Sequence, residues 1–232
     1  MTKHKVAIMT GCSQRIGAGL AAAYRARGWA VVASAHAIMP SQDPDLLTVA
    51  ADIAQPATGA LIIDAALERF GRIDTLVNNS GVFISKPFTE YTAEDYALMV
   101  GVNLTGFFWL TQRVIAEMAT RYGGHVVTIT ATLAEYANSG ELAVLAALTK
   151  AGLVAATTSL AVEYASYGIR VNAVSPGIIK PPESYDGLGD RLPPPGRGGQ
   201  VSDVVDGVLF LESSPCITGK ILHIDGGQVT AR

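Results

Sequence analysis

Short apolar runs and longer amphipathic segments alternate along this chain. The runs predict strands at Lys5–Thr10, Trp29–Ser34, Leu47–Ala51, Thr75–Asn78, His125–Ile129, Arg170–Val174 and Ile221–Ile224. Apolar residues at helical spacing predict helices at Ile16–Arg27, at Ala60–Phe70, from Thr92 towards Tyr122, and at Ala143–Tyr164. Parallel neighbouring strands need crossover connections, so this alternation predicts an α/β fold. We expect one doubly wound parallel sheet of about seven strands with helices on both faces.

The length and composition predict a single domain over residues 1–232. A chain of 232 residues with 49% hydrophobic content can build one large core, and no linker-like run divides it. One compositional break occurs at 178–202, where five prolines and five glycines gather without periodicity. This segment follows the carboxyl end of a predicted strand, where open sheets of this kind bind ligands. We therefore expect a short substrate lid at about 178–202.

Charge and cysteine content narrow the classes of partner. The formal charge of −3 and the lack of a basic cluster argue against nucleic acid as a partner. The apolar run Val6–Met9 is too short for a membrane span or a signal peptide, so we expect a cytoplasmic protein without a membrane partner. Cys12 and Cys216 are expected to stay unpaired in that compartment. The expected partner is a small molecule, with no metal site.

A glycine-rich turn joins the first predicted strand to the first predicted helix. Gly11, Ser13, Ile16 and Gly17 lie in this turn, where the helix start directs amide groups and the positive end of its dipole at a ligand. A pyrophosphate suits that environment, although glycine can also serve the turn's shape alone. Arg15 could bind a cofactor phosphate through its planar guanidinium, or it could be a solvated residue of the first helical turn.

An ordered series of short motifs resembles the short-chain dehydrogenase/reductase family. The series is Thr10–Gly17, Asp52–Ile53, Asn78–Gly81, Asn103, Lys150, Ser175–Gly177 and Asp225–Gly227. Arg15 makes the glycine motif similar to that of the pteridine reductase branch. The resemblance spans Val6 to Gly227 and implies a Rossmann-type fold, an NAD(P)(H)-dependent oxidoreductase, and a homo-oligomer (dimer or tetramer).

The resemblance also implies a set of cofactor-binding residues. Asp52 and Ile53 match the adenine-binding pair, and Asn79, Ser80 and Gly81 match the motif that shapes the ribose site. Lys150 is expected to hold the ribose hydroxyls. The segment with Pro176, Gly177 and Ile179 resembles the one beside the nicotinamide carboxamide.

The second predicted strand bears on the choice of cofactor. NAD-specific relatives usually carry a carboxylate at its end, whereas Ala33–His36 contains no acid. Ser34 and His36, with Arg15 nearby, could instead donate hydrogen bonds to a 2′-phosphate. The sequence therefore favours NADP(H) over NAD(H), although His36 can also be read as an ordinary loop residue.

The proton donor that the resemblance implies is missing. The family uses a tyrosine four residues before the lysine, on the same helix face, and this chain has Ala146 there. The family's serine falls near Thr130-Ala131-Thr132, where Thr132 is the nearest hydroxyl. Asn103 matches an asparagine that links a water to the lysine, and Tyr136 could reach the site through loop geometry.

Two hypotheses of function remain open at this point. The first is an NAD(P)(H)-dependent oxidoreductase that reduces a carbonyl or related small molecule, in which water, Lys150, Thr132 or a loop tyrosine handles the proton. The second is a nucleotide-binding protein without turnover that serves as a sensor or partner subunit. A third reading, a non-redox enzyme that reuses the nucleotide site, has less support. The candidate catalytic residues are Asn103, Thr132, Tyr136 and Lys150.

Overall fold

The computed structural model describes residues 4–137, 142–180 and 193–230, and within them the strands form one parallel sheet. The strands are β1 Val6–Thr10, β2 Ala30–Ala35, β3 Leu46–Ala50, β4 Thr75–Asn78, β5 Gly124–Ile129, β6 Ile169–Pro176 and β7 Ile221–Ile224. Their order across the sheet is β3-β2-β1-β4-β5-β6-β7. The chain thus starts near the middle, moves outward to β3, and returns to β4 beside β1. The prediction of a doubly wound parallel sheet is confirmed.

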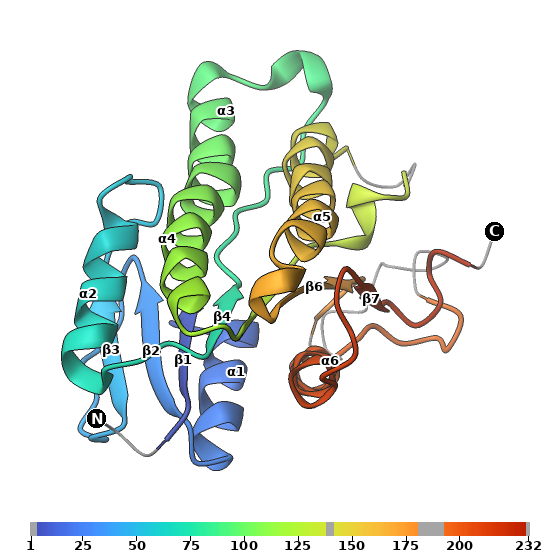
Figure 1. Cartoon of the computed structure of the whole chain (residues 1–232). Coiled ribbons are helices and arrows are strands. Elements are labelled where there is room, and N and C mark those ends of the chain that lie inside the picture. Colours follow the sequence, from blue (N-terminus) through green and yellow to red (C-terminus); the bar gives the residue numbers. More distant parts are fainter. Residues whose placement is uncertain (1–3, 138–141, 181–192, 231–232) are drawn as a thin grey trace.

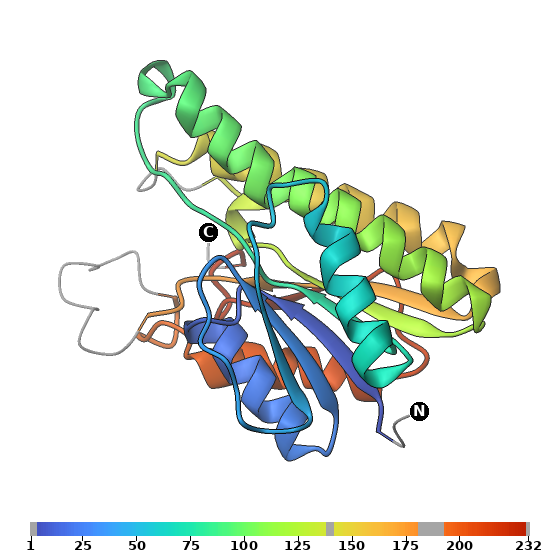
Figure 2. The same cartoon turned by 90° about the vertical axis from the view of Figure 1, so that its left-hand side faces the viewer.

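Helices cover both faces of the sheet (Figures 1 and 2). They are α1 Arg15–Ala26, α2 Thr58–Phe70, α3 Ala93–Val100, α4 Gly106–Thr120, α5 Val144–Glu163 and α6 Val201–Ser213. Shorter helical turns are η1 Phe88–Glu90, η2 Gly101–Thr105, η3 Thr132–Ala134 and η4 Ala165–Tyr167. Helices α2, α4 and α5 lie on one face, and α1 and α6 lie on the other (Figure 1).

Two apolar clusters, one on each face, form the core. Val6 and Ile8 pack with α2 and α4 in one cluster, whereas Ala7 and Met9 pack with α1 and α6 in the other. Successive strand residues point to opposite faces, and here both faces are covered. This burial on both sides explains why the strands appear in the sequence as continuous apolar runs.

The helix predicted from Thr92 towards Tyr122 is two helices. Thr92 caps α3 as predicted, because its side chain accepts from the backbone N–H of Asp95 at 3.2 Å and the Asp95 carboxylate accepts from the Thr92 N–H. The π-helical turn η2 then separates α3 from α4. Such turns interrupt the regular hydrogen-bond ladder and often occur at functional sites.

Helix α6 was missed by the sequence analysis. Val204, Val205, Val208 and Leu211 are buried against α1 and the sheet, and their spacing was a usable signal. The lid predicted at 178–202 therefore overlaps the first turn of α6, which begins at Val201. Residues 181–192 of that segment lie outside the described residues.

Candidate nucleotide-binding and active site

An open cleft of about 560 Å³ lies beside the carboxyl ends of β1, β2 and β4. The chain reverses direction across the sheet between β1 and β4, which is where open α/β sheets form ligand crevices. The lining includes twelve of the predicted cofactor residues: Gly11, Ser13, Arg15, Ile16, Gly17, Ser34, His36, Asp52, Ile53, Asn79, Ser80 and Gly81. It also includes Gln14, Ala35, Ala51, Val82, Leu98 and Val102, which the sequence analysis did not single out.

The backbone of the glycine turn, from Gly11 to Gly17, forms part of the wall of the cleft. Gln14, the N-cap residue of α1, makes no capping hydrogen bond with its side chain, and the first turn contains no acidic residue. The amide groups at the start of α1 are therefore not capped by a side chain, and such a helix end favours an anion. A Cβ atom on Gly17 would lie 2.1 Å from the Gly11 carbonyl oxygen, so only glycine fits there.

Asn79 and Thr10 hold the turn in place. The Asn79 side-chain amide donates to the carbonyl oxygens of Thr10 (2.9 Å) and Gly11 (3.1 Å). The Thr10 hydroxyl in turn accepts from the backbone N–H groups of Asn79 (3.0 Å) and Ser80 (2.9 Å). Asn79 therefore has a structural role in fixing the carboxyl end of β1 to that of β4.

Ser34, His36 and Asp52 lie at the β2 and β3 side of the cleft. Ser34 is the buried next-to-last residue of β2, and His36 follows β2 on the surface. Asp52 accepts from the backbone N–H of Ala54 at 3.0 Å and from the Gln55 side chain at 3.2 Å. These hydrogen bonds, with that from Ala54 as the largest cause, hold the pKa of Asp52 below its usual value. The carboxylate is therefore ionised at neutral pH and organises the turn that precedes α2.

The residues of this cleft fit a dinucleotide. The Gly17 position leaves room that any side chain would fill, the α1 start offers amide donors, and Ser13, Ser34 and His36 add side-chain donors. A nicotinamide dinucleotide bound there would supply a hydride.

Lys150 is a residue of α5, and its side chain reaches the carboxyl end of β5. Its ammonium donates to the Ile129 carbonyl oxygen at 2.8 Å. A Cβ atom on Gly81 would lie 3.1 Å from Lys150 Nζ and 3.4 Å from Asn103 Oδ1, so these three residues meet at the β4 end of the cleft. Burial lowers the pKa of Lys150 to about 8. A lysine with this pKa exchanges a proton near neutral pH.

Asn103 braces the segment that follows β4. Its Oδ1 accepts from the Val82 N–H at 2.9 Å, and its Nδ2 donates to the Val82 carbonyl oxygen at 3.1 Å. The same Nδ2 donates to the Thr149 hydroxyl at 3.1 Å, which joins η2 to α5 beside Lys150. Thr149 was not predicted, although its position next to Lys150 pointed to it.

Ala146 lies in an apolar cluster. It is 2% exposed and packs with Met99, Ala143 and Leu145, and partly buried side chains that include Val82, Tyr91 and Leu133 border the cluster. Apolar side chains therefore surround the position at which relatives carry the tyrosine. Thr132 begins η3, which packs against α5.

Tyr136 lies near β7. Its ring meets the His223 ring edge-on, with 6.1 Å between centroids. His223 Nε2 also lies 2.9 Å from a Glu135 carboxylate oxygen, a pair that the sequence analysis missed.

The segment after β6 reaches the cleft through Arg15. Gly177 donates its N–H to the Ile224 carbonyl oxygen at 3.1 Å, and Ile179 forms an isolated bridge with Gly199. The Arg15 guanidinium donates to the Ile179 carbonyl oxygen at 2.7 Å. Arg15 adopts a φ of 51°, in the left-handed region that favours glycine. Ile179 is thus tied to the glycine turn through Arg15, whereas Pro176 and Gly177 lie beside Ile224 of β7, and none of the three lines the cleft.

Comparisons with known proteins agree with this geometry. Residues 11–228 match the family model described as enoyl-(acyl carrier protein) reductase. The chain is 31% identical over 251 residues to the 3-oxoacyl-[acyl-carrier-protein] reductase FabG of Thermotoga maritima, with 97% of this chain and 98% of the relative covered. The chain belongs to the short-chain dehydrogenase/reductase family.

Solved structures of family members carry nicotinamide cofactors. ElxO with NADP bound superposes with a TM-score of 0.89 at 26% identity, covering 98% of this chain and 99% of that one. The 3-ketoacyl-(acyl-carrier-protein) reductase of Brucella melitensis, complexed with NADH, gives a TM-score of 0.87 at 28% identity, with 97% and 98% covered. The prediction of an NAD(P)-dependent short-chain oxidoreductase is confirmed at the level of the family.

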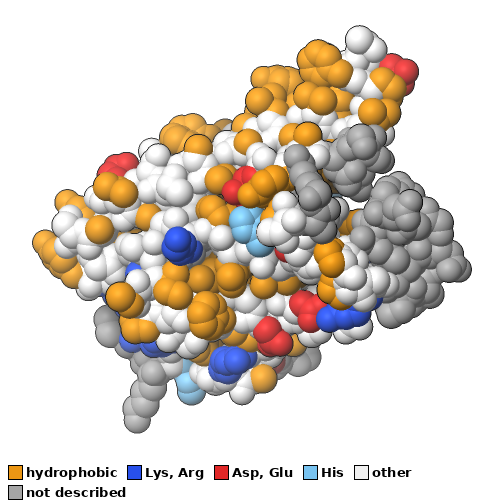
Figure 3. Space-filling model, turned by 90° about the vertical axis from the view of Figure 1, so that its right-hand side faces the viewer, with side chains coloured by type: hydrophobic (Ala, Val, Ile, Leu, Met, Phe, Trp, Pro, Cys, Tyr) orange, Lys and Arg blue, Asp and Glu red, His pale blue; other side chains and the backbone are white. Residues whose placement is uncertain are grey.

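Helix α5 has the length and composition of a membrane span. Core helices of globular proteins often pass the same test, and the described part of the chain contains one such helix. Here α5 packs one side, including Leu145, Leu153 and Ala161, against β6 and the rest of the structure. This packing is that of a helix covering a sheet. Figure 3 shows hydrophobic side chains spread over the side of the molecule with α5, α6 and β7.

Proposed function

We propose that this chain is an NADP(H)-dependent reductase of a small carbonyl compound, in which Lys150 supplies the proton. The observation that carries the proposal is the partly buried Lys150 ammonium at the β4 end of the cleft, with its pKa near 8. Hydride addition to a carbonyl carbon leaves an alkoxide, which needs a proton. An ammonium with a pKa near neutrality can give that proton without a tyrosine and regain it from water.

The surrounding residues set the position of Lys150. Asn103 fixes both the Val82 backbone and Thr149, while the Ile129 carbonyl accepts from the ammonium. The Thr149 hydroxyl also donates to backbone carbonyl oxygens of α5, 3.1 Å from both Leu145 and Ala146. Thr132 and Tyr136 remain candidates for contacts to the substrate from η3 and the loop that follows it.

The preference for NADP(H) rests on the β2 end of the cleft. Ser34 and His36 stand where a carboxylate would hold ribose hydroxyls, and Arg15 adds a cation at the same cleft. We expect NADPH to bind at least about 10-fold more tightly than NADH, since a charge-assisted hydrogen bond is worth about 1.5–3 kcal/mol. Fluorescence titration of both cofactors tests this expectation. Equal affinities would contradict it, and His36→Gln should reduce the ratio.

Turnover is tested by following cofactor absorbance with ketones, aldehydes, 3-oxoacyl thioesters, quinones and pterins. The 3-oxoacyl thioesters are included because the relatives are named for such substrates. The pterins are included because the glycine motif with Arg15 is similar to that of the pteridine reductase branch. Oxidation of NADPH by one of these compounds, lost in Lys150→Met, supports the proposal.

A nucleotide-binding protein without turnover is the second candidate function. The apolar packing around Ala146 favours it, because the position that carries the acid in relatives is filled by core contacts. NADPH binding with no oxidation across the whole panel would support this candidate and contradict the first.

Replacing Ala146 by tyrosine is expected to destabilise the fold. Placing a phenol in the cluster around Met99 and Leu145 overfills it, and overpacking costs about 1–3 kcal/mol of unfolding free energy. Urea denaturation measures this loss. Ala22→Tyr, at an exposed position of α1 on the other face of the sheet, is the matched control and should change stability by less than about 0.5 kcal/mol. A ~10²–10⁴-fold rise in carbonyl reduction in Ala146→Tyr would show instead that the absent phenol limits the reaction.

We also propose that the chain forms a homo-oligomer, a dimer or tetramer. Large apolar side chains are exposed on two neighbouring helices, namely Phe108 and Trp109 on α4 and Val144, Leu148 and Val162 on α5. Exposed apolar surface of this kind is typical of interaction sites.

A further inference from the structure

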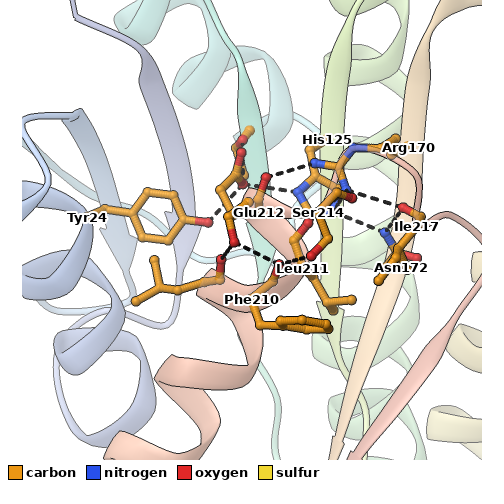
Figure 4. Close-up of polar contacts among 12 residues, drawn as sticks. Tyr24, His125, Arg170, Asn172, Phe210, Leu211, Glu212, Ser214 and Ile217 are labelled. Carbon is orange, nitrogen blue, oxygen red and sulfur yellow. Dashed lines mark hydrogen bonds and ion pairs between the residues drawn. The ribbon is translucent and has the colours of Figure 1, made fainter.

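A buried polar network lies at the amino ends of β4, β5 and β6, whereas the cleft lies at carboxyl ends of strands. The C-terminal end of α6 packs against the network (Figure 4). Its members come from five elements: Tyr24 of α1, Thr75 of β4, His125 of β5, Arg170 and Asn172 of β6, and Glu212 of α6. None of these residues belongs to the nucleotide site.

The Glu212 carboxylate is at the centre of the network. One of its oxygens accepts from the Tyr24 hydroxyl and the Thr75 hydroxyl, each at 3.0 Å, and lies 3.0 Å from His125 Nδ1. Burial acts to raise the pKa of Glu212, but the hydrogen bonds from His125, Thr75 and Tyr24 act against burial, and the pKa lies below its usual value. Glu212 is therefore ionised at neutral pH.

Arg170 ties the end of α6 to the sheet. Its guanidinium donates to the carbonyl oxygens of Leu211 (2.8 Å), Glu212 (3.2 Å), Ser214 (3.2 Å) and Ile217 (3.3 Å). A cation at a helix C-terminus satisfies carbonyl groups that have no partner within the helix. Ionised Arg170 and Glu212 balance each other in charge, so the network is neutral when His125 is neutral.

The hydrogen bonds fix the tautomer of His125. Its Nε2 lies 3.2 Å from the Asn172 side-chain amide and 3.3 Å from an Arg170 guanidinium nitrogen, both of which are donors. Asn172 cannot turn its oxygen to the imidazole, because its amide donates to the Ile217 carbonyl at 2.9 Å and its oxygen accepts from the Lys220 N–H at 3.1 Å. His125 Nε2 must therefore accept, and the proton is on Nδ1.

We propose that His125 holds the end of α6 against the sheet when its imidazole is neutral, and that protonation of the imidazole releases this helix end. A second proton on Nε2 would face the Asn172 and Arg170 donors and add a positive charge beside a guanidinium. The groups that face His125 from neighbouring elements are Glu212, Arg170 and Asn172, while Tyr24 and Thr75 reach it through Glu212. None of these groups can accept a hydrogen bond from the protonated Nε2 without giving up a hydrogen bond that it already makes.

The expected pH window follows from the position of the imidazole. His125 is 2% exposed, and burial is the largest cause that lowers its pKa below the usual 6.5. The unfolded chain takes up this proton near pH 6.5, whereas the folded chain resists it until a lower pH. The contribution of neutral His125 to stability is therefore complete above about pH 6.5 and is lost as the pH falls below that value.

Urea denaturation between pH 8 and pH 5 tests the proposal. In the wild type the unfolding equilibrium constant should rise by up to ~10-fold per pH unit below about pH 6.5, the limit for one proton. His125→Asn, whose amide can still donate to Glu212, should lose this component. His223→Gln is the matched control, since it removes a second His–Glu pair that is more exposed, and it should keep the wild-type pH dependence. An identical pH dependence in His125→Asn and wild type would overturn the proposal.

Imidazole NMR of the wild-type protein keeps the proposal testable if His125→Asn does not fold. The ¹⁵N shifts at pH 8 should show His125 protonated on Nδ1 and unprotonated on Nε2, and its titration midpoint should lie below 6.5. The protection factors of amide hydrogens at the end of α6, corrected for the pH dependence of intrinsic exchange, should fall as the pH is lowered over the same range. The opposite tautomer, or a midpoint at or above 6.5, would overturn the proposal.

Discussion

Gly17→Ala is expected to lower the free energy of unfolding by about 3 kcal/mol or more and to abolish NADPH binding. The new Cβ atom would lie 2.1 Å from the Gly11 carbonyl oxygen and 2.7 Å from the Asn79 amide nitrogen. Gly11 and Asn79 are joined by a hydrogen bond, so neither can move away without disrupting the turn. Overpacking against backbone is costlier than against a flexible side chain.

Urea denaturation and NADPH fluorescence titration measure the two effects of Gly17→Ala. Gly123→Ala is the matched control, because a Cβ at that surface position meets no atom within 4 Å. The control should keep both stability and cofactor affinity close to wild type. Tight NADPH binding by a folded Gly17→Ala protein would contradict the placement of the cofactor against this turn.

Lys150→Met is expected to weaken NADPH binding by roughly 10- to 100-fold and to reduce kcat/KM by ~10²–10⁴-fold. The first effect reflects the loss of charge-assisted hydrogen bonds to the cofactor. The second reflects the loss of the proton source, whose nitrogen in the free protein is 2.8 Å from the Ile129 carbonyl oxygen. Lys220→Met, which removes an exposed lysine beside β7, should change neither quantity.

The pH dependence separates the binding role of Lys150 from the proton-transfer role. Because the protonated amine is the active form for reduction, kcat/KM in the wild type should fall as the pH rises through about 8. Lys150→Arg retains the positive charge but stays protonated across this range. If Lys150→Arg shows the same fall in kcat/KM near pH 8 as the wild type, another group donates the proton.

Local sequence signals predicted most of the architecture. Apolar runs located the seven strands of the described residues to within a few residues. The signal is continuous in β1, β2, β4, β5 and β6 because these strands are buried on both faces, whereas β3 and β7 are half-buried. The pair Thr92 and Asp95 located the start of α3 through side-chain capping. The break at η2 was not predicted, and its residue Asn103 contacts Val82, which lies 21 residues earlier in the chain.

Some features of the candidate site could likewise be predicted from the sequence, and others could not. The residues of the glycine turn were visible in the sequence because a tight strand-to-helix turn demands glycine at fixed offsets, as Gly17 shows. The side chains that surround Ala146 could not be predicted from the sequence. Met99 and Leu133 come from elements distant in sequence, and only their packing shows that the position is filled.

The sequence by itself determined the order of the strands, most of the helices, the glycine turn and the substitution at Ala146, because each depends on neighbouring residues or fixed spacings. Only the tertiary structure decided how Lys150 meets Gly81 and how Arg15 reaches Ile179. It alone joined His125, Arg170 and Glu212 in one buried network. These contacts connect residues far apart in the chain, and their distances, burial and pKa values exist only once the sheet has brought the strands together.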